Sequence, residues 1–133
     1  MPVPFGISIE KQFKLVNNMS NVNDFVVGTS YIGEIDIAPS KLIAKFGSPM
    51  SNGDSKISGE YVFQGNTGRP ITLYDWKWTT LYDESNPFTP SGFWALDKPI
   101  RMNVGGKKKS DFYDFERWIK HLIKYWDVDR YGG

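Results

Sequence analysis

The side chains that could do chemistry in this chain are carboxylates, lysines and arginines, because the sequence has no thiol and almost no imidazole. The 133 residues contain no Cys and one His, His121, against 16 Lys plus Arg and 15 Asp plus Glu. A chain without Cys forms no disulfide, no thiolate nucleophile and no Cys-based metal or iron–sulfur site. A single His also excludes a two-His zinc site within one chain. Acid–base chemistry would therefore fall to carboxylates or to His121.

The carboxylates show no spacing that is diagnostic of an enzyme. Glu60 and Asp75 fall on neighbouring predicted strands, and paired acids at a suitable separation can hydrolyse glycosides. Adding Glu34 and Asp36 gives only a weak oxygen-ligand pattern for Mg²⁺ or Ca²⁺. His121 falls late in the last predicted helix, where a cation or imidazole suits the helix dipole better than a role as base. We therefore assign no catalytic residue, no metal ligand and no cofactor.

Three lysines follow two glycines where a predicted strand leads into the last helix. The segment Val104 to Lys109 reads Val-Gly-Gly-Lys-Lys-Lys, and glycine-rich turns before a helix can bind anions through backbone N–H groups. The Walker spacing GxxxxGK[ST] is absent. Asp111 and Asp114 already lie at the positive end of the helix, so an ordinary turn with a solvated run of charge is the alternative interpretation.

The elements that position these residues predict a single α+β domain spanning residues 1–133. We expect an antiparallel sheet of four to five strands, with a short helix and a longer C-terminal helix packed on one face. The predicted strands are 24–37 (with a bulge at Gly28 or Gly33), 56–64, 70–78 and 100–104, the last broken by Gly105-Gly106. Residues 1–23 are weakly patterned apart from a short helix over 9–16, residues 79–98 form a long loop, and residues 127–133 form a frayed tail.

The two main helices have clear boundaries in the sequence. Pro39 suits the first turn of a helix over 38–46, and Gly47 suits its C-terminal cap. Leu42 and Phe46 belong to its apolar stripe. The last helix, predicted over residues 111–126, has one apolar face. That face is formed by Phe112, Phe115, Ile119, Leu122, Ile123 and Trp126.

Alternation along the strands sorts side chains between a buried and an open face of the sheet. The expected inward set is Ile35, Ile37, Tyr61, Phe63, Tyr74, Trp76, Trp78, Ile100, Met102 and Val104. The expected open face carries Glu34, Asp36, Glu60, Asp75, Lys77, Arg101 and Asn103. This polar face is either simply solvated or the floor of a pocket. In the opposite register Ile71 and Leu73 point inward, and Tyr74, Trp76 and Trp78 form an exposed row able to stack bases.

The 79–98 loop is too long for a plain connection and is rich in aromatic residues. Phe88, Phe93 and Trp94 lie in it, and a packed flap over the sheet edge and a lid over a ligand are both consistent with its composition. As a lid, the loop would cover a small anionic or nucleotide-like ligand on the polar face. Lys77, Arg101 and Lys107 would then supply charge, Glu60, Asp75 and Asn103 hydrogen bonds, and Trp94 stacking.

An ordered series of short motifs spans roughly residues 27–118. It consists of Leu42-Ile-Ala-Lys-Phe-Gly-Ser-Pro49, Gly59-Glu-Tyr-Val-Phe63, Thr72-Leu-Tyr-Asp-Trp-Lys77 and Asn103-Val-Gly-Gly106. This series resembles small accessory proteins of tailed phages, which are mostly of unassigned function. The chain departs from that pattern in its longer Pro-rich loop at 83–99 and in its triple Lys.

The resemblance implies a viral, bacteriophage-encoded accessory or anti-defence protein that acts by binding. Such a protein would sequester a nucleotide-like ligand; the alternatives are an inhibitor of a host defence protein and a single-stranded nucleic-acid-binding protein. A net charge of +1 argues against a sequence-specific duplex-DNA binder. We expect a cytoplasmic protein, in the host cell if phage-encoded, because no stretch reaches the length of a membrane span and residues 1–14 lack the pattern of a secretory signal. Small size and many aromatics also suggest a homo-oligomer.

Overall fold

The sheet of this protein has five strands, and every neighbouring pair is antiparallel. The computed structural model describes residues 12–132, with side chains described over 12–123. The strands are β1 (Phe13–Leu15), β2 (Ser30–Ile37), β3 (Glu60–Gly65), β4 (Pro70–Tyr74) and β5 (Ile100–Gly106). The helices are α1 (Val22–Phe25), α2 (Pro39–Phe46), α3 (Pro90–Trp94) and α4 (Lys109–Gly132). The strand order β1-β3-β4-β5-β2 leaves β1 and β2 at the edges.

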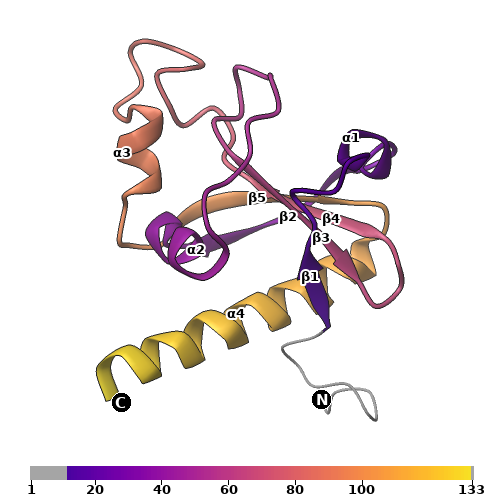
Figure 1. Ribbon diagram of the computed structural model, residues 1–133. Coiled ribbons are helices and arrows are strands. Elements are labelled where there is room, and N and C mark those ends of the chain that lie inside the picture. The colour runs from indigo at the N-terminus through magenta and orange to yellow at the C-terminus, as the bar shows by residue number, and fades with distance from the viewer. Residues whose placement is uncertain (1–11, 133) are drawn as a thin grey trace.

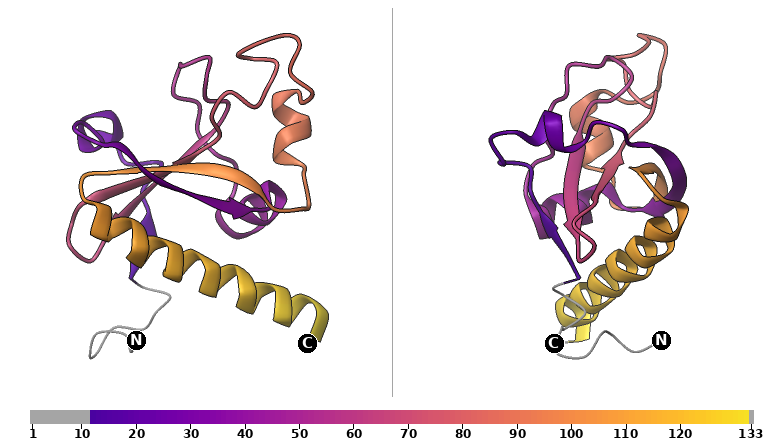
Figure 2. Two further views of the ribbon diagram at one scale, coloured as in Figure 1. Left: turned by 180° about the vertical axis from the view of Figure 1, so that it is seen from behind. Right: turned by 90° about the vertical axis from the view of Figure 1, so that its right-hand side faces the viewer.

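The predicted α+β architecture is confirmed, with α2 and α4 contributing to one core (Figure 1). Phe46 of α2 stacks against Trp118 of α4, with ring centroids 6.1 Å apart. Helix α1 lies on the other side of the sheet from α4 (Figure 2). The sheet therefore has a fully packed face toward α4 and a second face that only part of the chain covers.

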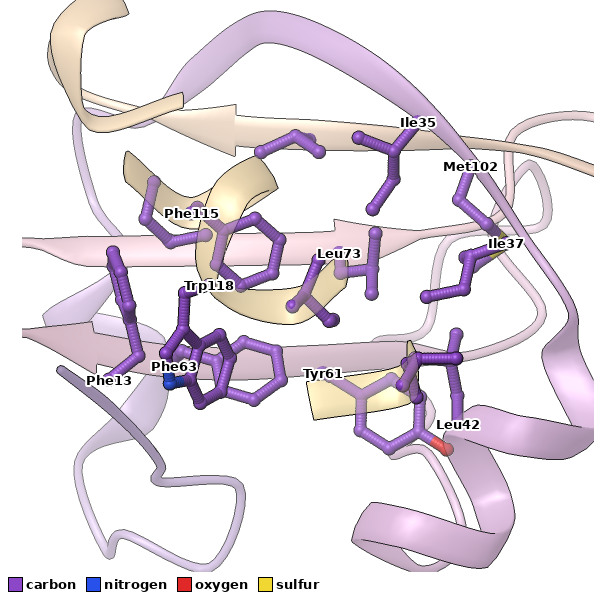
Figure 3. Packing of buried hydrophobic residues seen from close by; sticks show 14 of the residues in the cluster. Phe13, Ile35, Ile37, Leu42, Tyr61, Phe63, Leu73, Met102, Phe115 and Trp118 are labelled. Atoms are coloured by element: carbon purple, nitrogen blue, oxygen red, sulfur yellow. The ribbon is translucent and has the colours of Figure 1, made fainter. Parts of the chain in front are cut away.

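Aromatic and branched side chains fill the space between the sheet and α4. Phe13, Phe63, Phe115 and Trp118 gather at one end of this core (Figure 3). Their rings make edge-on and tilted contacts, with the Phe63 and Phe115 centroids 5.3 Å apart. The inward orientation predicted for most strand residues is confirmed, because the following are all buried: Ile35, Ile37, Tyr61, Phe63, Met102 and Val104. Ile100 is partly buried against the same core.

The predicted inward row of Tyr74, Trp76 and Trp78 is wrong for Tyr74 and Trp76, and β4 itself has the opposite register. Ile71 and Leu73 are 1% and 0% exposed, and they lie opposite Phe63 and Val104 in the ladder. Tyr74 consequently falls on the open face. The alternation of 74, 76 and 78 does not continue along a strand, because β4 ends at Tyr74 and Lys77 has a φ of 65°. Trp78 turns back and packs against the core.

Other strand boundaries differ from the prediction for reasons of pairing. Residues 13–15 of the predicted helix over 9–16 form β1 beside β3, whereas residues 9–11 lie outside the described residues. Residues 22–25 form α1, so β2 begins at Ser30 rather than at residue 24. A bulge lies between Tyr31 and Gly33, as expected for Gly33. A side chain at Gly33 would meet the Phe112 ring at 2.5 Å, which explains why glycine occupies this position.

The glycine pair at 105 and 106 continues β5 instead of breaking it. Gly105 lies opposite Thr72, whose Oγ1 would be 2.5 Å from an added Cβ. Glycine at position 105 therefore lets β4 and β5 approach each other closely, and it does not form a turn. Among the other boundaries, β3 begins at Glu60. Helix α2 ends at Phe46 and is followed by Gly47, whose φ is 84° as expected of a cap. Helix α4 starts at Lys109 and continues to Gly132; fraying from residue 127 stays a prediction.

Candidate ligand-binding surface

The predicted binding residues lie in three different places. Glu60, Lys77, Arg101 and Asn103 lie on or beside the open face of the sheet, Asp75 and Trp94 are buried, and Lys107 follows β5 at its far end. Arg101 and Lys107 are six residues apart along an extended strand, or ~20 Å at a rise of ~3.3 Å per residue. The structure therefore does not bring the predicted set together as one pocket.

One row of polar side chains crosses four strands of the open face. The ladders place Glu60 of β3 opposite Tyr74 of β4, Tyr74 opposite Asn103 of β5, and Asn103 opposite Glu34 of β2. Burial raises the pKa of Glu60 and of Tyr74, and the Asn103 side chain lowers the pKa of Tyr74 in part by hydrogen bonding to it. The row therefore holds a partly desolvated carboxyl beside a phenol and an amide.

The rest of the open face is partly covered by the chain that follows β1. Val62 and Thr72 belong to this face by register, yet they are 0% and 3% exposed. Asn17 accepts a hydrogen bond from the Val62 N–H at 2.6 Å and donates one to the Glu60 carbonyl at 3.3 Å. The accessible part of the open face is therefore the polar row from Glu60 to Glu34, together with the loops beyond it.

Aromatic rings and cations gather where β4 leaves the sheet. We call this region the aromatic–cationic surface, and its members are Lys56, Tyr74, Trp76, Lys77, Tyr82 and Arg101. The Lys77 Nζ lies 5.5 Å from the Trp76 ring centroid and 5.4 Å from that of Tyr82. The Lys56 Nζ lies 6.0 Å from the Trp76 ring. Tyr74 meets Trp76 edge-on, with centroids 6.2 Å apart.

Arg101 extends this surface along β5. Its guanidinium carbon lies 5.0 Å from the centroid of the Trp78 ring, and the Trp78 Nε1 donates to the Arg101 carbonyl at 2.9 Å. Asp36 lies opposite Arg101 in the ladder with β2. Cation–π contacts of this kind stabilise by roughly 0.5–1 kcal/mol at exposed sites, so they orient the cations while leaving their N–H groups able to bind an anion.

Two loops that lie at the same end of the sheet hold Lys56 and Lys77 near Trp76 (Figure 1). The Lys77 N–H donates to the Lys56 carbonyl at 2.7 Å. The Asn86 amide donates to the carbonyls of Lys77 and Thr79 at 3.0 and 2.9 Å. These bonds fix Lys77 in its positive-φ conformation, which is uncommon for a residue with a side chain.

Asp75 has a different environment from its neighbours Trp76 and Lys77. It is 0% exposed. One carboxylate oxygen accepts from the N–H groups of Ser58 and Gly59 at 2.7 and 3.0 Å, and the other accepts from the Ser58 hydroxyl at 2.7 Å. Burial raises the pKa of Asp75, and these hydrogen bonds oppose the rise. Asp75 thus anchors the loop before β3.

Trp94 completes what we call the Asp75 network, which consists of Asp75, Ser58, Gly59 and Trp94. The Trp94 Nε1 donates to the Ser58 hydroxyl oxygen at 2.9 Å. The ring is 6% exposed, and it packs edge-on against Tyr61 at 5.9 Å. A Cβ at position 59 would lie 2.6 Å from the Trp94 side chain. Glycine at this position therefore leaves the space that the Trp94 ring occupies. Stacking of Trp94 on a ligand would need α3 to move away.

The 79–98 loop is a packed flap in this structure. The Thr89 side chain caps α3 by accepting from the Gly92 N–H at 3.1 Å. Phe93 is 0% exposed and stacks on Trp78, with centroids 6.3 Å apart. Tyr82 stays 42% exposed. The loop therefore offers Tyr82, rather than Phe93 or Trp94, to a ligand at the surface.

Asp111 and Lys109, at the start of α4, already have hydrogen-bond partners within the chain. The Arg69 guanidinium makes two hydrogen bonds to the Asp111 carboxylate, at 2.7 and 2.8 Å, and Asp111 is 5% exposed. The Lys109 Nζ donates to the Ile32 carbonyl. Lys107 is exposed beside Gly28. The glycine–lysine segment therefore serves chiefly to join β5 to α4.

Sequence reasoning assigned the stacking of the lid to Trp94, named Trp76 only in the alternative register of the strand, and missed Lys56 and Tyr82. The available signal was the alternating order Tyr-Asp-Trp-Lys-Trp from Tyr74 to Trp78, in which aromatics alternate with charges. Over residues 12–132 no group of three or more His, Asp or Glu residues could hold a metal ion, and no described helix is long and apolar enough to cross a membrane. Comparison with protein-family models gives no match, and a search of curated proteins gives no significant relative.

Proposed function

We propose that this protein is a binding protein of the phage accessory type that sequesters a nucleotide-like anion on the aromatic–cationic surface. The observation that carries the proposal is that Lys56 and Lys77 lie within 6.0 Å of the ring of Trp76. A nucleotide combines a flat base, which stacks on an aromatic ring, with phosphate, which pairs with lysine. Here Trp76 offers the aromatic ring, and Lys56 and Lys77 beside it offer the positive charge.

The charges around this surface favour one orientation of the ligand. Glu60 and Glu34 lie in the polar row, and Asp36 lies beside Arg101 in the ladder with β5. A phosphate is repelled by these carboxylates, whereas the hydroxyl and amino groups of a sugar or base can donate to them. The phosphate should therefore lie at the loop end near Lys56 and Lys77, with the nucleoside directed toward Asn103 and Glu60.

The experiment is a titration with nucleoside phosphates and cyclic dinucleotides, followed by tryptophan fluorescence and by thermal unfolding. A ligand at 100 times its Kd stabilises a protein by about 2.7 kcal/mol. Because a base–aromatic stack contributes about 1–3 kcal/mol, Trp76→Leu should weaken binding by about 5-fold to 150-fold. Lys77→Ala should weaken it by a smaller factor, up to about 5-fold, since an exposed ion pair contributes at most about 1 kcal/mol.

The control variant is Lys107→Ala, which removes an exposed lysine at the far end of β5 and should leave affinity unchanged. Inorganic pyrophosphate serves as an anion without a base and should bind more weakly than a nucleotide. If no member of the panel changes fluorescence or unfolding temperature, or if Lys107→Ala weakens binding as much as Trp76→Leu, the proposal is wrong.

A second candidate, single-stranded nucleic-acid binding, is favoured by the position of Tyr74 on the open face. Tyr74 meets Trp76 edge-on at 6.2 Å, and consecutive aromatics can stack consecutive bases. Binding of a homopolymeric oligonucleotide that falls steeply as salt rises, and exceeds that of a mononucleotide, would support this candidate. A weak and salt-independent response would exclude it.

A further inference from the structure

The loop between α2 and β3 contains the dipeptide Asn52-Gly53 at an exposed position. Gly53 has a φ of 84°, and no heavy atom outside its immediate neighbours lies within 4 Å of where its Cβ would be. A backbone nitrogen that follows Asn can attack the side-chain carbonyl carbon, and glycine offers the least steric hindrance to that attack. This inference does not depend on the proposed ligand.

Both polar atoms of the Asn52 amide have partners suited to such a reaction. Its Oδ1 accepts a hydrogen bond from the Asp54 N–H at 2.9 Å, which folds the side chain back along its own backbone. Its Nδ2 donates to the Glu60 Oε1 at 3.3 Å. The hydrogen bond from the Asp54 N–H reaches the oxygen on which negative charge would develop. The hydrogen bond to Glu60 comes from the nitrogen that would leave.

We propose that Asn52 is a self-modification site, at which the amide is converted to a carboxyl with the assistance of Asp54 N–H and the Glu60 carboxyl. The Gly53 nitrogen loses its proton to solvent and forms a bond to Cγ of Asn52. The carbonyl electron pair moves to Oδ1, where the Asp54 N–H stabilises the negative charge. The electron pair on Oδ1 then re-forms the carbonyl and the Cγ–Nδ2 bond breaks. The nitrogen keeps the electron pair of that bond, takes a proton from Glu60 and leaves as ammonia.

The product of this step is a five-membered succinimide joining residues 52 and 53. Water opens one of its two C–N bonds, which gives aspartate or isoaspartate at position 52. The overall change consumes one water and releases one ammonia, and Glu60 regains its proton from solvent. Partial burial raises the pKa of Glu60 and outweighs the hydrogen bond from Asn52, which lowers it, so a larger fraction of this carboxyl is protonated near neutral pH than of an exposed Glu.

The modification would change the surroundings of Glu60. The new carboxylate would lose the donor that Nδ2 supplies and would face the Glu60 carboxyl instead. Like charges at such a separation disfavour ionisation of both groups. Glu60 pairs with Met50 through two backbone hydrogen bonds of 2.9 Å, so the repulsion acts where this loop joins β3.

The test is peptide mapping by mass spectrometry of the folded full chain during incubation at neutral pH. We expect the peptide with Asn52 to gain the mass difference between an amide and a carboxyl, in both aspartate and isoaspartate forms. Asn86 and Asn66 are internal comparisons: Asn86 precedes Pro87, which has no N–H to attack, and Asn66 precedes the β-branched Thr67. Both should convert far more slowly than Asn52.

Glu60→Gln should slow the conversion by roughly 100-fold, which is the low end of general acid–base assistance. The matched control is Glu116→Gln on α4, which should leave the rate unchanged; circular dichroism checks that both variants fold. The same mapping on the urea-unfolded chain gives the rate set by sequence alone. The proposal is overturned if Asn52 converts no faster than Asn66, if folding slows the conversion, or if Glu60→Gln reacts at the wild-type rate.

Discussion

Asp75 and Trp76 are adjacent in the sequence but belong to two regions with opposite properties. Asp75 is 0% exposed and accepts three hydrogen bonds within the Asp75 network. Trp76 is only half-buried, and Lys56 and Lys77 lie near its ring. The first region holds the loop 50–59 and α3 onto the sheet, and the second leaves polar and aromatic groups available. Two adjacent residues of types that could both bind a ligand therefore differ in burial and hydrogen bonding, and residue type alone does not predict that difference.

The largest effect should come from removing the buried carboxylate. Asp75→Ala leaves the N–H groups of Ser58 and Gly59 and the Ser58 hydroxyl without their acceptor. Since one unsatisfied buried donor costs about 1–3 kcal/mol, we expect a loss of at least ~3 kcal/mol in the free energy of unfolding, measured by urea denaturation. Asp75→Asn keeps the shape and one acceptor, and it should lose less. Equal stability of the alanine variant and the wild type would contradict the structural role.

A smaller effect is expected at the other end of the same network. Trp94→Phe keeps an aromatic ring against Tyr61 but removes the Nε1 donor to Ser58. We expect a loss of about 1 kcal/mol for one partly buried hydrogen bond, with some further loss from the smaller ring. Trp76→Phe, which makes the same chemical change at the surface, is the matched control and should change stability by less than ~0.5 kcal/mol. Equal losses in the two variants would remove the distinction between the regions.

The smallest effect concerns the pH dependence of stability at Glu60, on the border between the two regions. Burial raises the pKa of Glu60 in the folded state. The folded state therefore binds more protons than the unfolded state, and this group's contribution to stability falls as pH rises from the ordinary carboxyl pKa through the raised one. Glu60→Gln should flatten the loss of stability over that window. A steeper pH dependence in the variant would contradict this assignment.

The two longest helices, α2 and α4, and most of the core could be predicted from the sequence because local patterns determine them. Pro39 and Gly47 delimit α2, and α4 has a continuous apolar stripe that packs under the sheet. Strand ends were less predictable. Strand β1 forms only by pairing with β3, and Gly105 lets Thr72 approach β5 closely instead of forming a turn. Those outcomes depend on residues distant in sequence.

The register of β4 and the site were the least predictable parts. Both faces of β4 offered apolar residues, and only the buried partners Phe63 and Val104 decided that Ile71 and Leu73 point inward. The burial of Trp94 depends on Ser58 and on the space left by Gly59. Lys77 and Arg101 were predicted as binding residues; they lie on the aromatic–cationic surface, and their role in binding stays a prediction.

The most direct test of this comparison is to measure nucleotide affinity and unfolding free energy together for Trp76→Leu and Trp94→Leu. Trp76→Leu should lose affinity by about 5-fold or more while keeping wild-type stability. Trp94→Leu should lose more than 1 kcal/mol of stability while its folded fraction binds the nucleotide as the wild type does. Loss of binding in Trp94→Leu with wild-type affinity in Trp76→Leu would contradict this prediction.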